Sequence, residues 1–320
     1  MNGIDWQTLR RLRRTYLEGT AGLRDYWQSD ADLEAYDRTF AQRIGWKWDF
    51  VLADLEARGW RPPRGTVLDW GCGSGVAARA CLDHFGRTEI TRLHYADRSA
   101  QAVQYATRKA GMKYPGLEVA AGAVESPTVL LLSHVLTELS PEQVEALLEL
   151  ALTAETVLWV EPGSFEVSLA LIAIRERLRT VFHCVSPCPH QGRCGILAKG
   201  NEAHWCHHFA TPPSAVFQDP DWGRFAALLE IDLRSLPLSY LVLDRRPAPA
   251  PPADTVRVLG RPRIEKAGAR LLGCAAEGVR EFRLPKRTLP EAFHRFRKGR
   301  WPSWQRWACR QDEITEILAS

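Results

Sequence analysis

The chain has 320 residues, of which 45% are hydrophobic and 25% charged, with a formal net charge of +4 at pH 7, as is typical of a soluble globular protein that can hold one large domain and a smaller one. No apolar run approaches the roughly 18–20 residues that a membrane helix needs, and the N-terminus lacks the apolar core of a signal peptide. We therefore expect a cytoplasmic protein without membrane contact.

Residues 1–62 are predicted to form a helical N-terminal region. Apolar side chains recur at steps of three and four residues from Leu33 to Leu55, which indicates a helix. We expect it to begin with Asp30 as its N-cap and to end at Gly59.

Residues 63–247 alternate predicted strands and helices. The strands are expected at 66–70, 90–96, 117–120, 128–132 and 156–161, and the helices at 75–85, 99–110, 141–152 and 165–182. This alternation predicts an α/β fold with a mostly parallel, Rossmann-like sheet covered by helices on both faces. A Cys- and His-rich insertion at 184–209 interrupts the pattern.

A glycine-rich turn, GCGSG, follows the first predicted strand. The strand ends with Asp69, the turn contains Gly71, Gly73 and Gly75, and the second strand ends with Asp97. Glycines permit close approach of a ligand to the N-terminus of the next helix. An acidic residue at the end of the second strand can accept both hydrogen bonds of a ribose diol.

This arrangement resembles class I S-adenosylmethionine-dependent methyltransferases, whose first motif is an acidic residue followed by G-x-G-x-G. A dinucleotide dehydrogenase would carry G-x-G-x-x-G, whereas position 76 is Val. The resemblance implies S-adenosylmethionine as cofactor, with Ser133 and His134 beside it. His134 and Glu138 could do acid–base work or could only contact the cofactor or cap a turn. The catalytic residues are unknown, and whether a methyl group is transferred stays open.

The insertion contains several potential metal ligands. Its cysteines are Cys184, Cys188, Cys194 and Cys206. Zinc sites usually show C-x2–4-C pairs, and only the first two cysteines come near that spacing. Looser spacing suits an iron–sulfur cluster, which takes four thiolates from several directions. Cys274, in a later predicted strand, can complete the set, but the residues alone leave zinc and iron–sulfur open.

Residues 255–320, after a Pro/Ala linker at 248–254, are predicted to form a basic, β-rich C-terminal domain and tail. Residues 257–310 contain 15 Lys and Arg against four Glu. Among the last of these charges stand five aromatic residues, Phe293, Phe296, Trp301, Trp304 and Trp307. Basic side chains beside stacking rings predict RNA contact. A solvated basic face, with rings that pack the last helix, is the alternative.

Together, VLDWGCGSG, SHVLTEL, the CPH-x3-C segment with WCHHF and the late cysteine resemble the small-ribosomal-subunit methyltransferase-like proteins of the Rsm type, found in bacteria and mitochondria. The resemblance covers roughly residues 30–290. It implies a class I methyltransferase fold that associates with the small subunit during assembly. It also implies a 4Fe–4S cluster on Cys188, Cys194, Cys206 and Cys274, whereas Cys184 and Cys309 match no ligand position.

We therefore expect a monomeric assembly or translation factor of the small ribosomal subunit that binds S-adenosylmethionine, carries the iron–sulfur cluster and contacts ribosomal RNA. An active rRNA methyltransferase is one alternative. An RNA-binding protein that holds zinc in place of the cluster is the other.

Overall fold

The computed structural model describes residues 4–19, 22 and 25–318, which fold into two compact units. Unit 1 contains Met1–Pro162 and Ala210–Leu238, and unit 2 contains Gly163–Phe209 and Ser239–Ser320. Within the described ranges, no helix combines the length and apolar character needed to cross a membrane.

Three helices open unit 1: α1 (Trp6–Leu17), α2 (Asp30–Asp37) and α3 (Phe40–Ala57). The expectation of one helix that begins with Asp30 as its N-cap is wrong. The Ser29 side chain caps α2 by accepting a hydrogen bond from the Asp32 amide. The chain then breaks at Thr39, whose hydroxyl donates to the Ala35 carbonyl at 2.6 Å. Such a side-chain bond competes with the helical hydrogen bonds of the backbone.

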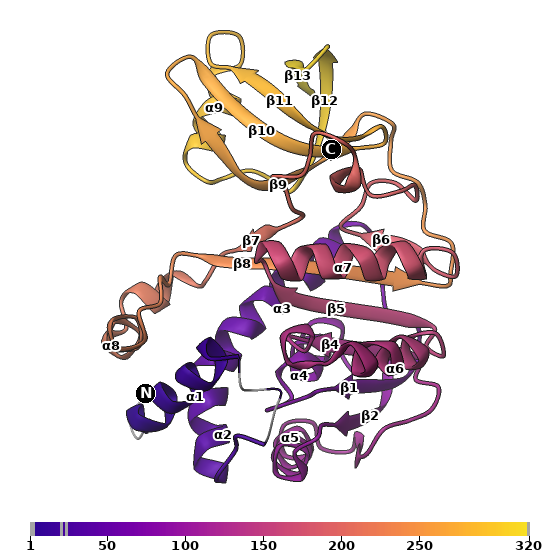
Figure 1. Cartoon of the computed structure of the whole chain (residues 1–320), viewed down its shortest axis with the longest axis vertical. Coiled ribbons are helices and arrows are strands. Elements are labelled where there is room, and N and C mark those ends of the chain that lie inside the picture. Colours follow the sequence, from indigo (N-terminus) through magenta and orange to yellow (C-terminus); the bar gives the residue numbers. More distant parts are fainter. Residues whose placement is uncertain (1–3, 20–21, 23–24, 319–320) are drawn as a thin grey trace. The chain divides into compact units, whose positions relative to one another are not determined.

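The sheet of unit 1 is parallel, as predicted. Its strands are β1 (Gly65–Trp70), β2 (Ile90–Ala96), β3 (Glu118–Ala121), β4 (Val129–Ser133) and β5 (Thr156–Pro162), in the order β3-β2-β1-β4-β5. The helices that follow strands are α4 (Val76–Phe85), α5 (Ala100–Lys113) and α6 (Pro141–Ala151), and α8 (Pro220–Leu229) comes later in the chain. Helix α4 packs on β1 and β4, and α5 packs on β2 and β3 (Figure 1). The carboxyl ends of β1, β2 and β4 therefore meet at one edge of the sheet.

Unit 2 begins with α7 (Phe165–Leu178) and the cysteine-rich segment. Two short strands, β6 (His183–Ser186) and β7 (His208–Ala210), pair with β8 (Leu236–Asp244), and β6 runs antiparallel to it. Between β6 and β7 the chain forms loops and one helical turn, η2 (Gly195–Leu197).

The rest of unit 2 is a closed five-stranded barrel, which confirms the predicted small β domain. Its elements are β9 (Thr255–Ile264), β10 (Gly268–Ala275), β11 (Gly278–Pro285), α9 (Pro290–Arg297), β12 (Trp304–Arg310) and β13 (Glu313–Leu318). The strands close in the order β9-β10-β11-β13-β12, and only the β11–β13 pair among them is parallel. This order, with a helix between the third and fourth strands, is the arrangement of an OB-fold (Figure 1).

The aromatic residues of the basic segment mostly fill this barrel. Phe293, Phe296 and Trp307 are only 5%, 4% and 3% exposed and belong to the barrel core. The expectation that these rings offer stacking surfaces is therefore wrong for all three. A small barrel has few apolar side chains of its own, so the apolar face of α9 completes the core.

Candidate cofactor pocket and cysteine site

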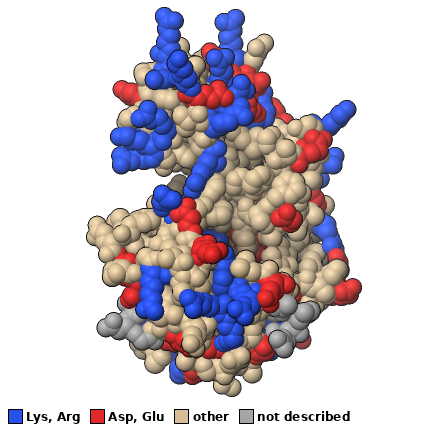
Figure 2. All heavy atoms as spheres, turned by 60° about the vertical axis from the view of Figure 1, so that its left-hand side comes forward, with Lys and Arg blue, Asp and Glu red and all other residues tan. Residues whose placement is uncertain are grey.

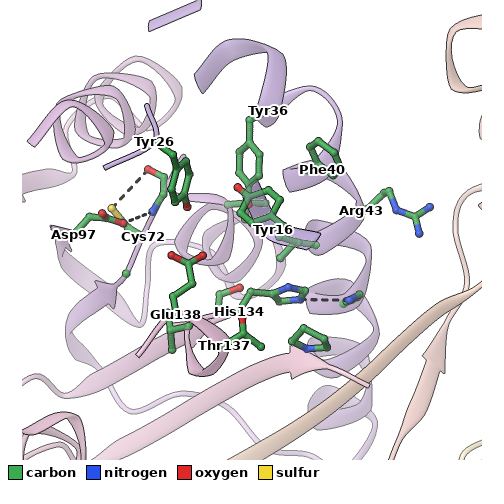
Figure 3. A pocket seen from close by; sticks show the side chains of 18 of the residues that line it. Tyr16, Tyr26, Tyr36, Phe40, Arg43, Cys72, Asp97, His134, Thr137 and Glu138 are labelled. Atoms are coloured by element: carbon green, nitrogen blue, oxygen red, sulfur yellow. Dashed lines mark hydrogen bonds between the residues drawn. The ribbon is translucent and has the colours of Figure 1, made fainter. Parts of the chain in front are cut away.

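Unit 1 contains a cavity of about 910 Å³ at the carboxyl ends of its strands (Figure 3). Five of the residues expected at the cofactor site line it: Gly71, Gly73, Asp97, Ser133 and His134. Asp69 and Gly75, also expected there, lie outside the lining. The turn after β1, the end of β2 and the end of β4 thus meet at one cavity, as ligand sites of parallel sheets do.

The glycines of the turn have different tasks. Gly73 has φ +49°, and a Cβ atom there would meet nothing within 4 Å, so its backbone leaves open space. Gly75 has φ +80°, and its Cβ would lie 2.9 Å from both the Ala106 Cβ and the Tyr95 Cε1. Gly75 therefore lets α4 pack closely against its neighbours, whereas Gly73 allows a ligand to approach the backbone.

The two aspartates also differ. Asp69 is fully buried, and its Oδ2 accepts a hydrogen bond from the Ala78 amide at 3.1 Å, which fixes the start of α4. Burial raises the pKa of Asp69 to about 8. Asp97 lines the cavity, and its two oxygens accept from the Gly73 and Ser99 amides, each at 2.9 Å. Each carboxylate oxygen has a further lone pair, so Asp97 can also accept from ligand hydroxyl groups.

Ser133 ends β4, His134 follows it, and both line the cavity. The Ser133 hydroxyl accepts a hydrogen bond from Trp48 Nε1 at 3.0 Å. His134 has a left-handed backbone (φ +58°), and its Nε2 lies 3.3 Å from Lys47 Nζ. Burial, with the nearby Lys47 charge as a second cause, lowers the pKa of His134 well below its usual value.

Lys47 is a site residue that the sequence reasoning missed. It is 8% exposed and lines the cavity, and burial lowers its pKa to about 7. One signal was available, because Lys47 lies between Ile44 and Val51 on the apolar face of α3. Lysine side chains are almost never buried unless they are paired, so a lysine at such a position indicates a specific role.

A buried carboxylate supports the loop after β4. Glu161 Oε1 accepts hydrogen bonds from Trp159 Nε1 at 2.7 Å and from the Val135 and Leu136 amides at 3.0 and 3.2 Å. Burial raises the pKa of Glu161 to about 7. Glu161 thus ties β5 to the loop that presents His134.

The four cysteines expected as ligands come together in unit 2. Cys194 and Cys274 belong to one buried cluster, against which Cys206 packs. Cys188, Cys194 and Cys206 line one small cavity. Burial raises the pKa of Cys274, and the charges of the other three cysteines raise it further. Their thiols are therefore close enough to interact electrostatically.

The cysteine-rich segment docks on the barrel at the β10–β11 turn. A Cβ on Gly195 would lie 2.4 Å from the Val279 amide nitrogen, so only glycine permits this approach. Asn201 Nδ2 donates to the Gly195 and Val279 carbonyls at 2.8 and 3.0 Å. These contacts bring Cys194 to the strand that carries Cys274.

Cys184 and Cys309, expected not to be ligands, differ in their surroundings. Cys309 is exposed on β12. Cys184 is buried beside Cys188, and its hydrogen bond is the largest cause that lowers the pKa of Cys188, to about 6. Arg175 contributes to the same shift.

The cysteines can be compared with the ligand sets that metal groups require. Among the described side chains, no three or more His, Cys, Asp or Glu residues converge closely enough to hold one metal ion. A 4Fe–4S cluster is larger than one ion and takes four thiolates from different directions. Four cysteines on three separate segments of unit 2 have the donor chemistry of that group.

The chain is similar to several solved structures of methyltransferases. Magnesium protoporphyrin IX methyltransferase from Synechocystis PCC 6803, with bound S-adenosylmethionine, is 13% identical, with a TM-score of 0.41 over 77% of this chain and 100% of that one. A candidate RNA methyltransferase from Pyrococcus horikoshii is 11% identical, with a TM-score of 0.39 over 62% and 83% of the two chains. Precorrin-6y C5,15-methyltransferase from Geobacter metallireducens is 10% identical, with a TM-score of 0.36 over 61% and 86%.

No curated protein sequence matches the chain. The sequence pattern of one protein family, described as mitochondrial small ribosomal subunit Rsm22, matches residues 51–305. This match includes the glycine turn, the loop after β4, the cysteine-rich segment and most of the barrel. The chain belongs to the Rsm22 family.

Proposed function

We propose that the protein is an assembly or translation factor of the small ribosomal subunit. In this proposal, the barrel and α9 bind ribosomal RNA, the unit 1 cavity binds S-adenosylmethionine, and Cys188, Cys194, Cys206 and Cys274 hold a 4Fe–4S cluster. Membership of the Rsm22 family supports the association with the small subunit.

The barrel topology carries the RNA part of the proposal. OB-folds bind oligonucleotides on the outer face of their second and third strands, here β10 and β11. The end of this face near Cys274 packs against the cysteine-rich segment. At the other end, the exposed Arg270 is paired with Glu265 and Glu281. Because Arg270 is already paired, it would bind a phosphate less strongly than an unpaired arginine.

Unpaired positive charge lies on and around α9. The structure's described residues provide no ion-pair partner for five exposed cations, which are Arg287, Arg295, Arg297, Lys298 and Arg300. Lys and Arg side chains project from the barrel at the top of Figure 2. Free cations on one surface of an OB-fold are what a phosphate backbone would bind.

The salt dependence of RNA binding tests this surface. We expect Arg295→Gln/Arg297→Gln to lower the slope of log affinity against log salt by about 0.7 for each lost phosphate contact with single-stranded RNA. Arg10→Gln/Arg14→Gln, which removes two exposed arginines from α1, is the matched control and should leave the slope unchanged. Equal slopes for both variants and the wild type would contradict RNA contact through α9.

The cavity geometry supports the cofactor part. Gly73 leaves room for a ligand, and Asp97 faces the same cavity with unused lone pairs. We expect Asp97→Ala to weaken the binding of S-adenosylhomocysteine by about 2–3 kcal/mol in calorimetry, because two ribose hydroxyls lose their acceptor. Asp83→Ala, on the exposed face of α4, should bind as the wild type does. Equal binding by the Asp97 variant would remove Asp97 from the site.

Bound to the four cysteines, the cluster would cross-link the cysteine-rich segment to the barrel, because metal binding at such sites contributes folding energy. Cys274 lies on β10, and the other three ligands lie outside the barrel strands. The cluster would thereby hold the cysteine-rich segment against the Cys274 end of the β10–β11 face.

An active RNA methyltransferase is the second candidate, and Lys47 favours it. Its amine lies at the cavity 3.3 Å from His134 Nε2, and burial brings its pKa to about 7. Near pH 7 such an amine is partly neutral, so it can accept a proton from the group that is methylated. Transfer of a labelled methyl group to small-subunit RNA, lost in Lys47→Met, would establish this activity.

A further inference from the structure

The cavity of unit 1 has a second side that the expected cofactor residues do not form. Four half-buried rings lie there, from α1, the segment before α2, α2 and α3: Tyr16, Tyr26, Tyr36 and Phe40. Figure 3 shows them across the cavity from Glu138, Thr137 and His134. The rings are thus placed to contact a ligand that the glycine turn does not reach.

These rings form a continuous wall. The centroid of Tyr16 lies 5.6 Å from that of Tyr26 and 6.1 Å from that of Phe40, and Tyr36 lies 6.0 Å from Phe40. All four rings pack against a buried cluster of unit 1, but they are only partly buried and they also line the cavity. A wall of this kind provides stacking area for a flat ligand.

Two arginines from the helices that carry Tyr16 and Phe40 also line the cavity, Arg13 on α1 and Arg43 on α3. Arg13 Nε and Arg43 Nη1 are buried and have no hydrogen-bond partner within the described part of the chain. Arg43 Nη2 donates to the Ser235 carbonyl at 3.2 Å, which fixes its position. Burial lowers the pKa of Arg43 to about 10, and the neighbouring Arg13 charge adds to this effect while Asp232 opposes it.

Buried donors without acceptors are costly unless a ligand satisfies them. Guanidinium groups bind phosphate with good geometry. A neutral flat ligand would leave Arg13 and Arg43 unsatisfied, and a simple anion would leave the aromatic wall unused. The combination calls for one ligand with both a flat ring and an anionic group.

We propose that this side of the cavity binds a single RNA nucleotide turned out of its strand, with the base against the wall and a phosphate at Arg13 and Arg43. Enzymes and factors that act on bases admit them into pockets of this kind by stacking and edge contacts. Glu138 lies opposite the wall (Figure 3), with its Oε2 3.4 Å from Arg98 Nη2, and its carboxylate has further lone pairs that can accept from a base N–H group. The choice of RNA as the source of the nucleotide rests on the proposed function.

Nucleotide titrations test the inference with the full chain. Calorimetry with CMP and UMP, in the presence and absence of saturating S-adenosylhomocysteine, should give saturable binding. Ribose 5-phosphate, which lacks the base, and cytidine, which lacks the phosphate, should bind much more weakly. Pyrimidine nucleotides avoid competition for a site that recognises adenosine.

Two matched pairs of variants locate the binding. Phe40→Leu should weaken CMP binding on the order of tenfold, as expected for the loss of one stacking ring, whereas Phe50→Leu, a half-buried ring of the same helix outside the cavity lining, should not. Arg13→Met should weaken it similarly, whereas Arg14→Met, at the neighbouring exposed position, should not.

The outcomes separate this inference from the cofactor proposal. Ribose 5-phosphate that binds as tightly as CMP, or no CMP binding with or without S-adenosylhomocysteine, would overturn the nucleotide site alone. Loss of CMP binding in Asp97→Ala, or its displacement by S-adenosylhomocysteine, would assign the nucleotide to the cofactor side and also overturn it. CMP binding that depends on Phe40 and Arg13, in a protein that fails to bind S-adenosylhomocysteine, would support the inference and contradict only the cofactor proposal.

Discussion

Arg175 donates its Nε hydrogen to the sulfur of Cys188 at 3.2 Å, although the two residues lie on different elements of unit 2. Its Nη2 also donates to the His190 and Gly192 carbonyls at 3.2 and 3.0 Å. Arg175 is only 2% exposed. One buried guanidinium from α7 therefore organises the loop that contains Cys188 and leads to Cys194.

Replacement of this arginine should destabilise unit 2. We expect Arg175→Met to lower the free energy of unfolding by about 3 kcal/mol, because two carbonyls and a thiol lose a charged donor in a buried place. Arg179→Met is the matched control. Both arginines pair with Glu176, but the Arg179 side chain is 34% exposed, so its loss should cost less than about 1 kcal/mol. Urea unfolding measures both, and equal losses would contradict an organising role for Arg175.

The last two glycines of the turn, Gly73 and Gly75, should separate stability from binding. Gly75→Ala should lower the free energy of unfolding by about 3 kcal/mol, because the new Cβ has both an unfavourable φ and close contacts. Gly73→Ala should cost about 1 kcal/mol, since only the φ is unfavourable.

Gly73→Ala should nevertheless be the variant that loses affinity for S-adenosylhomocysteine, because its Cβ would occupy the open space beside the turn. Thermal unfolding and calorimetry on the same preparations give both quantities. Wild-type affinity in Gly73→Ala would show that no ligand approaches this part of the backbone.

Lys47 should make stability depend on pH. Its pKa in the folded protein, about 7, lies below the usual value of 10.5, so the unfolded chain binds this proton more tightly between the two values. The free-energy cost of burying the charged Lys47 amine is therefore complete below pH 7, and it decreases as the pH rises toward 10.5.

Lys47→Met removes this dependence. The difference in unfolding free energy between the variant and the wild type should shrink by roughly 4 kcal/mol between pH 6 and pH 10.5, with the variant more stable at the lower pH. Glu161, whose raised pKa gives the opposite slope between about pH 4.5 and 7, is present in both proteins and largely cancels. Parallel stability curves would mean that Lys47 stays charged in the folded protein.

The sequence was sufficient to predict those features of the fold and the site that follow from a local pattern of residues. The alternation of strands and helices predicted the parallel sheet. The glycine turn and Asp97 predicted three residues of one cavity lining, and the resemblance to methyltransferases implied two more, Ser133 and His134. Hydrophobic periodicity also indicated α2 and α3, but it could not reveal the break at Thr39. That break depends on a side-chain hydrogen bond to the Ala35 carbonyl, which competes with the helix.

Other features depend on tertiary packing. Tyr16, Tyr26, Tyr36 and Phe40 are spread over 25 positions, and only the fold of α1–α3 brings their rings to one wall. The sequence also did not determine whether the rings of the basic segment are exposed or buried. They are mostly buried, because the apolar face of α9 fills the core of the barrel.

The cysteine set gives the sharpest test of the proposed cluster. Protein purified without oxygen should be brown and contain about four irons per chain, as the 4Fe–4S type requires. Cys194→Ser and Cys274→Ser should each abolish the iron content. Cys309→Ser should retain it because that residue is exposed on β12, and Cys184→Ser should also retain it because a serine hydroxyl can still donate to Cys188.

Loss of the cluster should also loosen distant segments together. Cys194 and Cys274 lie far apart in the sequence, but the contacts of Gly195 and Asn201 with Val279 bring their segments together. Since metal binding adds folding energy to both segments, Cys274→Ser should increase hydrogen exchange over residues 186–209 as much as Cys194→Ser does. A colourless protein with one zinc, lost in Cys184→Ser but kept in Cys274→Ser, would instead establish a local zinc site and contradict the cluster.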